Sequence, residues 1–265
     1  MKPFIKWAGG KRWLTDHPDF EVPAFSGTYI EPFLGGGAMF FHVKPNKAIL
    51  TDANKRLIEA YLAVRDNYQS VEKKLLKYQK LHSPDFYYKE RSINRRTVSN
   101  RAAQFLYLNR SCWNGLYREN LNGVFNVPIG TKSKIIFEEE KFSEISNRLK
   151  NCEIMCSDFE KIIDRAKEQD LVFIDPPYTT AHNTNGFIKY NQNIFRWEDQ
   201  IRLKNASLRA ADRGAKIIIT NADHESIHFL YNGIGKMETI PRKSVISGNK
   251  KGRQMTTETI YFINT

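Results

Sequence analysis

A short apolar run, Leu171–Ile174, ends abruptly at the tetrapeptide Asp175-Pro176-Pro177-Tyr178, and this junction limits the folds open to the chain. An apolar run of this length, bounded by Asp170 and two prolines, is typical of a strand buried inside a sheet. In open α/β sheets, the loops that follow such strands hold the reactive groups. We therefore expect an α/β fold with functional residues directly after this strand.

The tetrapeptide forms a stiff corner, because each proline fixes φ and lacks an N–H, and the residue before a proline is kept out of the helical region. Asp175 contributes a carboxylate, Pro176 a carbonyl and Tyr178 an aromatic face. The two oxygens can accept the hydrogens of an amino group, while the aromatic ring stacks on a flat ring. The corner suits a planar ring bearing an amino group, and these three residues are the candidate catalytic residues.

Near the amino terminus, the sequence predicts a strand at Thr28–Phe33, a turn at Gly35-Gly36-Gly37 and then a helix. The next strand, Ala48–Leu50, leads to Asp52, about 20 residues after the glycines, where a nucleotide ribose is usually held. Alternatively, Asp52 caps the helix that follows. The turn lacks both the G-x-G-x-x-G pattern and the Gly-Lys-Ser/Thr of a phosphate loop, which disfavours dinucleotides and ATP.

The α/β alternation is interrupted in the middle of the chain. Two charged helical segments, Val71–Leu81 and Ser99–Arg110, precede a segment rich in glycine and asparagine. In that segment, Asn114-Gly115 and Asn122-Gly123 predict a hairpin or an extended loop. We interpret the interruption as a recognition domain inserted into a discontinuous catalytic core. The predicted bounds are 64–139 for the inserted domain and 1–63 with 140–265 for the core.

The chain is strongly basic, with 41 Lys and Arg against 29 Asp and Glu, for a formal net charge of +12. Twelve of the basic residues and only four acidic ones lie between Arg65 and Arg118. Such a concentration of positive charge favours an anionic partner, with nucleic acid ahead of a membrane surface. No apolar run reaches the length of about 18 residues that crosses a bilayer, and no signal-peptide core opens the sequence.

The three cysteines, Cys112, Cys152 and Cys156, are odd in number and are expected to stay reduced, which predicts a cytoplasmic location. Cys152 and Cys156 straddle a predicted strand without a nearby histidine, so we expect packing residues and no metal site. Two polar segments, Thr179–Phe195 and Arg242–Arg253, are expected to be loops, the first of them over the site.

Several short motifs stand together in a characteristic order. They are Lys6–Lys11, Glu31–Gly37, Thr51–Asn54, Ser157–Phe159 and Asp175–Tyr178. In these motifs the chain resembles the Dam-type methyltransferases, which transfer a methyl group from S-adenosyl-L-methionine to adenine in DNA. The segments Asn114–Arg118 and Phe125–Pro128 resemble the element with which that family recognises its DNA site. The resemblance implies a mixed, mostly parallel doubly wound sheet, the Rossmann-like methyltransferase core, with an inserted mainly helical DNA-recognition domain.

The resemblance also implies roles for single residues. Lys11 would meet the carboxylate of the cofactor, and Asp52 its ribose. Asp158 would accept from the amino group of the cofactor's adenine, with Phe159 packed on that ring, and Asp175 would touch both the cofactor and the target amino group. The full set implied for S-adenosyl-L-methionine is Trp7, Lys11, Phe33, Gly35, Asp52, Asp158, Phe159 and Asp175.

The expected partner is double-stranded DNA with a target resembling GATC, and the adenine must be flipped out of the duplex to be reached. Trp113 either fills the gap left by that base or is a buried core residue. Arg118 either reads a guanine through O6 and N7, or holds a phosphate or a neighbouring carboxylate. The residues expected to contact DNA are Lys6, Trp113, Asn114, Leu116, Arg118 and Pro128.

Three alternatives stay open. Asp175 favours adenine, because related cytosine and protein-glutamine methyltransferases carry Ser and Asn at that point, yet adenine in RNA is a second substrate. The run His224-Glu225-Ser226-Ile227-His228 satisfies the H-E-x-x-H pattern of zinc hydrolases, although no third histidine follows at ligand spacing. A DNA-binding protein without catalysis is the third. A bacterial or phage enzyme of this kind either acts alone or accompanies a restriction endonuclease, and the oligomeric state is not indicated.

Overall fold

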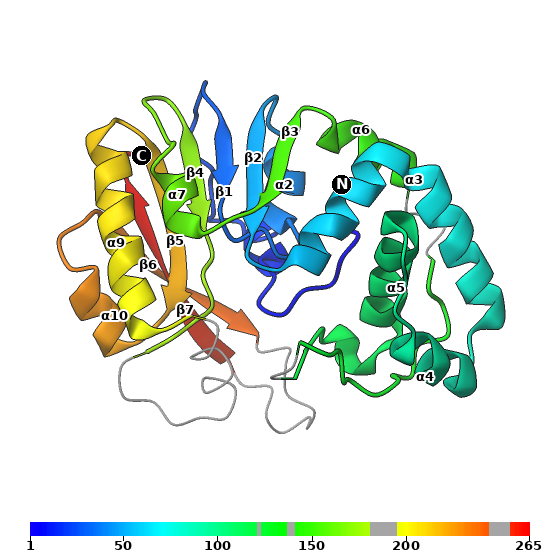
Figure 1. Ribbon diagram of the computed structural model, residues 1–265. Helices are drawn as coiled ribbons and strands as arrows, with labels where there is room; N and C mark the ends of the chain where they lie inside the picture. Colours follow the sequence, from blue (N-terminus) through cyan, green and yellow to red (C-terminus); the bar gives the residue numbers. More distant parts are fainter. Residues whose placement is uncertain (121–122, 137–140, 181–194, 244–254) are drawn as a thin grey trace. The chain divides into compact units, whose positions relative to one another are not determined.

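The computed structural model of the chain describes residues 1–120, 123–136, 141–180, 195–243 and 255–265 (Figure 1). Most of the two predicted loops, Thr179–Phe195 and Arg242–Arg253, lies outside the described residues. The chain forms two compact units. The helical unit comprises Met1–Thr15, Leu34–Asn46 and Asp52–Cys156, and the sheet unit comprises Asp16–Phe33, Lys47–Thr51 and Ser157–Thr265.

In the helical unit, the elements are α1 (Arg12–Thr15), α2 (Ala38–Val43), α3 (Lys55–Leu81), α4 (Pro84–Ser92), α5 (Val98–Ser111), the 3-10 turn η1 (Trp113–Gly115), α6 (Phe142–Leu149) and strand β3 (Cys152–Cys156). The helix predicted at Val71–Leu81 is the second half of α3, which is interrupted by non-helical angles at Asn67. Every residue of α5 from Ala102 to Ser111 is buried, so α5 is the central helix of this unit.

The strands form one seven-stranded sheet in the order β3-β2-β1-β4-β5-β7-β6. The strands besides β3 are β1 (Tyr29–Glu31), β2 (Ala48–Asp52), β4 (Leu171–Ile174), β5 (Lys216–Ala222), β6 (Lys236–Lys243) and β7 (Met255–Ile263). The β1–β2, β1–β4 and β4–β5 pairs are parallel, whereas β5–β7 and β7–β6 are antiparallel. The predicted mixed, mostly parallel α/β fold is confirmed.

Strand β4 has the predicted bounds, and all four of its residues are buried. It lies between β1 and β5, so both neighbours supply hydrogen bonds and both faces are covered, which explains the unbroken apolar run. In the described residues of the sheet unit, the remaining helices are α7 (Phe159–Ile163), α9 (Trp197–Asp212) and α10 (Glu225–Leu230), and α9 packs on α7 and β5 (Figure 1).

Strand β6 is not predicted by the sequence. It is the edge strand of the sheet, and it is polar and contains Pro241. A proline is tolerated only where one side of a strand needs no ladder hydrogen bond, and polar residues are common at an edge. The residues of β6 therefore carry little of the apolar signal by which strands are recognised.

The exposure of Cys156 differs from expectation. Cys112 and Cys152 are buried, but Cys156 is exposed at the end of β3, so the prediction that it packs in the interior is wrong. Cys156 is on the same face of β3 as the buried Cys152 and Ile154, but it is the last residue of this edge strand and is exposed there. No helix in the described parts of the chain is long and apolar enough to span a membrane.

The predicted domains, 64–139 inserted into 1–63 and 140–265, follow different bounds from the two compact units. The amino-terminal residues and the glycine turn group with the helices, and residue 64 lies inside α3. The predicted division separates a catalytic core from a recognition domain, whereas the two units are defined by their compactness. The predicted division therefore stays a prediction.

Candidate active site

The corner that follows β4 is fixed to the neighbouring strand β5. In the β4–β5 register Ile174 is opposite Ile219, so Asp175 lies beside Thr220. The Thr220 hydroxyl donates to Oδ1 of Asp175 at 2.8 Å. Pro176 is buried, and Asp175 is half-buried. The carboxylate of the corner is thus oriented by a residue of the sheet and stays partly accessible.

Tyr178, at the other end of the corner, is tied to strand β7. Its hydroxyl donates to Oε2 of Glu258 at 2.7 Å, and Oε1 of Glu258 lies 2.7 Å from Nε of Arg242 on β6. Burial, followed by the charges of Glu258 and Asp175, raises the pKa of Tyr178 well above its ordinary value. Sequence reasoning missed Glu258, which lies within β7 and belongs to none of the motifs.

Phe33, Phe159 and Phe195 form an aromatic cluster in the sheet unit. The Phe33 and Phe159 rings stack with centroids 5.3 Å apart, and Phe195 lies 5.6 Å from each of them. The guanidinium of Arg202 lies 4.8 Å from the centre of the Phe159 ring and donates to both oxygens of Asp158 at 3.0 and 3.1 Å. Arg202, also missed from the sequence, thus holds the residue pair expected to meet the adenine of the cofactor.

In the helical unit, Asp52 fixes the glycine turn. Its Oδ2 accepts the Gly35 N–H at 3.0 Å, and its Oδ1 accepts the Asn54 N–H at 2.9 Å. Burial raises the pKa of Asp52, and hydrogen bonds from Asn54, Gly35 and Ala53 act in the opposite direction. The cap of α3 is Asn54, which accepts from Leu57, so the alternative role of Asp52 as a helix cap is wrong.

Trp7 lies against the same turn. A Cβ on Gly35 would lie 2.7 Å from Cδ1 of Trp7, and Gly35 has a φ of 46°, so only glycine fits there. The Trp7 ring stacks on Tyr117 at 5.7 Å. Lys11 is buried, and its ammonium donates to the Gly9 carbonyl at 2.8 Å. Trp7, Gly35 and Asp52 are therefore brought together around one turn, as the motifs predict.

Except for Lys6, which lies near the amino terminus, the predicted DNA contacts lie on the segment that follows α5. Trp113 is 50% exposed, so its alternative role as a buried core residue is wrong. Arg118 is exposed and its Nε donates to Oδ1 of Asn126 at 3.3 Å. An isolated antiparallel bridge joins Glu119 to Phe125, as a hairpin requires, whereas the first turn signal, Asn114-Gly115, lies in the 3-10 turn η1. Asn114 and Pro128 are exposed, and Leu116 is half-buried.

The H-E-x-x-H run does not present two histidines from one helical face. His224 is the N-cap of α10 with extended backbone angles, and its Nδ1 accepts the Ser226 N–H at 3.2 Å. His228 pairs through Nε2 with Asp223 at 2.9 Å. Within the described parts of the chain, no group of three His, Cys, Asp or Glu side chains is arranged to hold a metal ion. The zinc-hydrolase alternative therefore lacks the arrangement that it requires.

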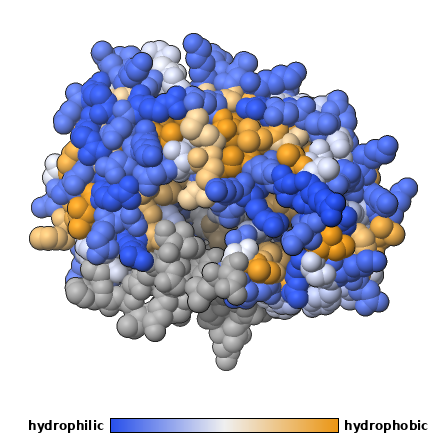
Figure 2. All heavy atoms as spheres, viewed as in Figure 1, coloured by the Kyte–Doolittle hydropathy of each residue, from blue (hydrophilic) through white to orange (hydrophobic). Residues whose placement is uncertain are grey.

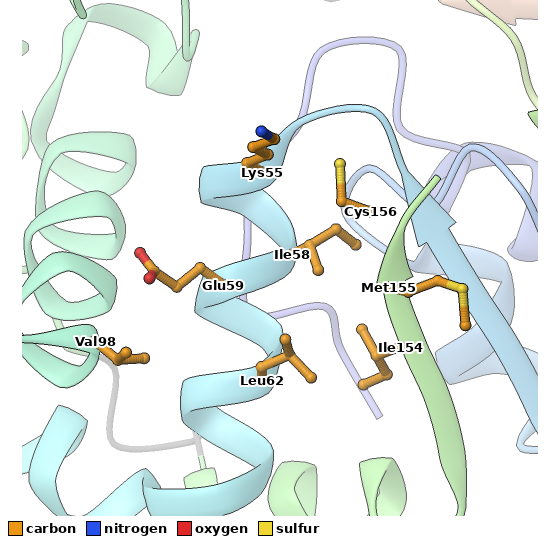
Figure 3. A pocket seen from close by; sticks show the side chains of 8 residues that line it. All are labelled: Lys55, Ile58, Glu59, Leu62, Val98, Ile154, Met155 and Cys156. Carbon is orange, nitrogen blue, oxygen red and sulfur yellow. The ribbon is translucent and has the colours of Figure 1, made fainter. Parts of the chain in front are cut away.

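A hollow of about 470 Å³ is present in the helical unit, between α3 and β3 (Figure 3). Figure 2 shows apolar surface over this region. None of the residues with a predicted role lines the hollow, so it is not the candidate active site. Its lining consists of Lys55, Ile58, Glu59, Leu62, Val98, Ile154, Met155 and Cys156.

The mixed sheet, with an Asp-Pro-Pro-Tyr corner at the carboxyl end of β4, defines an α/β methyltransferase. The chain belongs to the D12 class N6 adenine-specific DNA methyltransferases, whose family model matches residues 7–247. The protein is accordingly an enzyme that methylates adenine in DNA, which favours DNA over the RNA alternative.

Relatives of known name agree with this family. The chain is 36% identical to the Type II methyltransferase M1.LlaDCHI of Lactococcus lactis subsp. cremoris, over 87% of this chain and 84% of the relative. It is 33% identical to the Type II methyltransferase M.MjaIII of Methanocaldococcus jannaschii, over 95% of each chain. The identity to the DNA adenine methylase of Escherichia coli strain K12 is 31%, over 97% of this chain and 93% of the relative.

Proposed function

We propose that the enzyme transfers a methyl group from S-adenosyl-L-methionine to N6 of an adenine flipped out of double-stranded DNA, within a site resembling GATC. The observation that carries this proposal is the corner after β4. Asp175 is oriented by Thr220 at 2.8 Å and Tyr178 by Glu258 at 2.7 Å, so a carboxylate and an aromatic ring are held ready for a planar amino-bearing base.

The residues of the helical unit fit S-adenosyl-L-methionine. Gly9 has a φ of 78° with open space where a Cβ would lie, so a ligand can approach the main chain there. Asp52 accepts main-chain hydrogen bonds, but a carboxylate has about four acceptor positions, so ribose hydroxyls still find an acceptor. Lys11 supplies the positive charge that a carboxylate needs. We propose that these residues bind the cofactor with Trp7 and Gly35.

The sheet unit supplies the acceptor and aromatic residues of the proposed site. Asp158 is a carboxylate that can accept from an adenine amino group, and Phe159 is an aromatic partner for that ring. Arg202 contacts both of them, so we propose that it orients Asp158 when the cofactor is bound. Phe33, stacked on Phe159, belongs to the same proposed surface.

When bound, S-adenosyl-L-methionine supplies a methyl group on a positively charged sulfur. Asp175 and the Pro176 carbonyl accept hydrogen bonds from the two N6 hydrogens, which withdraws the N6 lone pair from the ring and directs it at the methyl carbon. The lone pair would then accept the methyl group, the sulfur of the cofactor would keep the electron pair of the S–C bond, and one N6 proton would pass to solvent. The contribution of the protein is therefore positioning and electrostatics.

DNA binding is proposed for the segment after α5 and for Lys6. Arg118 is exposed, its Nε donates to the Asn126 amide, and a guanidinium can donate to both O6 and N7 of a guanine. Trp113 projects half its surface into solvent, as a wedge into the stack requires. Leu116 and Pro128 are apolar groups for a thymine methyl. Because two relatives are named Type II methyltransferases, we propose a companion restriction endonuclease as a partner. The cytoplasm, where cysteines stay reduced, is the proposed location.

The test is methylation of plasmid DNA by the parent and by Asp175→Ala, with mapping of the modified bases. We expect N6-methyladenine in GATC-like sites from the parent only. The variant should bind DNA with nearly the parent's affinity, because affinity comes mainly from phosphate contacts elsewhere. Near-normal turnover by Asp175→Ala would refute the assignment of the site, and modification outside GATC would refute the proposed target alone.

A further inference from the structure

We propose that Glu258 is a positioning residue for methyl transfer. By accepting the hydrogen bond of the Tyr178 hydroxyl, Glu258 fixes the ring on which the target adenine stacks. This inference rests on the proposed function of the Asp175–Tyr178 corner and deepens it, because it adds a residue of β7 that has no part in the motif.

The first support is the state of the Glu258 carboxylate. Glu258 is only 2% exposed, and its two oxygens face Tyr178 and Arg242, each at 2.7 Å. A carboxylate at such depth is tolerated when it is paired with a cation and hydrogen-bonded. An ionised carboxylate only accepts hydrogen bonds, so the Tyr178 hydroxyl must be the donor. The raised pKa of Tyr178 agrees with a hydroxyl that keeps its proton.

The second support is the geometry of a phenol. The O–H bond of a phenol prefers the plane of the ring, because the oxygen lone pair is conjugated with it. One acceptor at a fixed point therefore sets both the position of the ring's tip and the plane of the ring. For Tyr178, that acceptor is Glu258. A stacking partner held in this way loses little further freedom when a base arrives.

The third support is the rigidity of the place from which Glu258 projects. In the antiparallel registers of β7, Glu258 is opposite Ala222 on β5 and Ile240 on β6, so the ladder holds it on both sides. A residue in the interior of a sheet is placed more accurately than one on a loop. With Thr220 of β5 on Asp175, the corner is fastened at both ends to strands that follow it in the chain.

The experiment is a double-mutant cycle with Tyr178→Phe, Glu258→Met and the double variant of the full chain. Tyr178→Phe keeps the ring and removes the hydroxyl, while Met keeps the length of Glu258 without an acceptor. We expect the single-turnover rate constant of methyl transfer to fall about 10-fold in each single variant, which is the size of one charge-assisted hydrogen bond. The double variant should also be about 10-fold slower rather than about 100-fold, because both changes remove the same interaction. KM for S-adenosyl-L-methionine should stay within about twofold.

A matched control is available in the helical unit. The Tyr78 hydroxyl donates to Oε1 of the buried Glu90 at 2.8 Å, and Glu90 also pairs with Arg95. This is the same Tyr–Glu–Arg arrangement away from the corner. Tyr78→Phe should therefore reduce thermal stability about as much as Tyr178→Phe, with kcat within about twofold of the parent.

The outcomes separate the two claims. If the parent methylates adenine but the rate losses of the two single variants multiply in the double variant, the role of Glu258 is overturned and the proposed function is left intact. Absence of adenine methylation by the parent would overturn both. If Glu258→Met does not fold, Tyr178→Phe decides alone, and a kcat within about twofold of the parent would overturn the inference.

Discussion

The side chain of Asn109 makes two hydrogen bonds with the main chain of Lys6: Oδ1 accepts the Lys6 N–H at 3.1 Å, and Nδ2 donates to the Lys6 carbonyl at 2.7 Å. Asn109 is completely buried on α5, whereas Lys6 is exposed and its ammonium donates to the Asn114 carbonyl. A buried amide thus fixes the main chain beneath two predicted DNA contacts.

Two variants separate the structural part of this arrangement from the DNA contact. Asn109→Leu leaves the Lys6 N–H and carbonyl without their partner, so we expect a loss of about 2–3 kcal/mol in the free energy of unfolding. Lys6→Met keeps the main-chain bonds and should change that free energy by less than about 0.5 kcal/mol, while weakening methylation of the preferred site. Urea unfolding measures the free energy of unfolding, and methylation of a panel of DNA sites measures the activity on the preferred site. Equal stability of Asn109→Leu and the parent would contradict the structural role.

Asp52 gives a prediction about cofactor affinity. Asp52→Asn removes the charge that we propose for the ribose, so binding of S-adenosyl-L-methionine should weaken by roughly 1.5–3 kcal/mol in calorimetry without DNA. Asn54→Ala is the matched control two residues away. It removes the true cap of α3 and should cost about 1 kcal/mol of stability while leaving cofactor affinity unchanged. Unchanged affinity in Asp52→Asn would restrict Asp52 to holding the glycine turn.

The raised pKa of Asp52 also predicts a pH dependence. Burial is the main cause of the shift. Cofactor affinity should decline as the pH falls through this pKa, at a higher pH than for an ordinary Asp with a pKa of about 3.9. The contribution to stability has the opposite sign: it is present below the unfolded pKa and is lost as the pH rises through the native value. Calorimetry across acid pH should show the decline in the parent and a flatter profile in Asp52→Asn.

The half-exposed Trp113 predicts an effect on base flipping that is separate from its effect on stability. Trp113→Ala should lower the free energy of unfolding by about 1–3 kcal/mol, because the buried half of the ring loses its contacts. Flipping should become less favourable by about 1–3 kcal/mol, the range for stacking on a base. Base flipping is measured by the fluorescence of 2-aminopurine placed at the position of the target adenine. The control is Phe229→Ala, since Phe229 is an aromatic residue of α10 that is 85% exposed. An equal loss of base flipping in both variants would argue against a wedge.

Arg118 tests how the target is chosen. Arg118→Ala should lose about 1–3 kcal/mol of discrimination at one base pair of a GATC panel with single changes. A phosphate-holding arginine would instead weaken binding evenly and lower the salt dependence by about one charge. The measurement is the ranking of the altered sites by both proteins. The same ranking in parent and variant would show that Arg118 does not read a base.

The sequence by itself determined the features that depend on neighbours in the chain. The apolar run Leu171–Ile174 and the prolines after it predicted β4 and its corner with the correct bounds, because burial and fixed φ angles are local properties. Glycines with positive φ marked the turn at Gly35 for the same reason. The order of such local motifs was enough to indicate the family.

Only the tertiary structure decided which side chains hold these motifs in place. Glu258 is 80 positions from Tyr178, Arg202 is 44 from Asp158, and Lys6 is 103 from Asn109. Such pairs are set by strand register and helix packing. Many sequences with the same local patterns would bring other side chains together. A buried polar group must find a partner somewhere, but its own sequence neighbourhood does not say where, because the partner is supplied by the packing of distant elements.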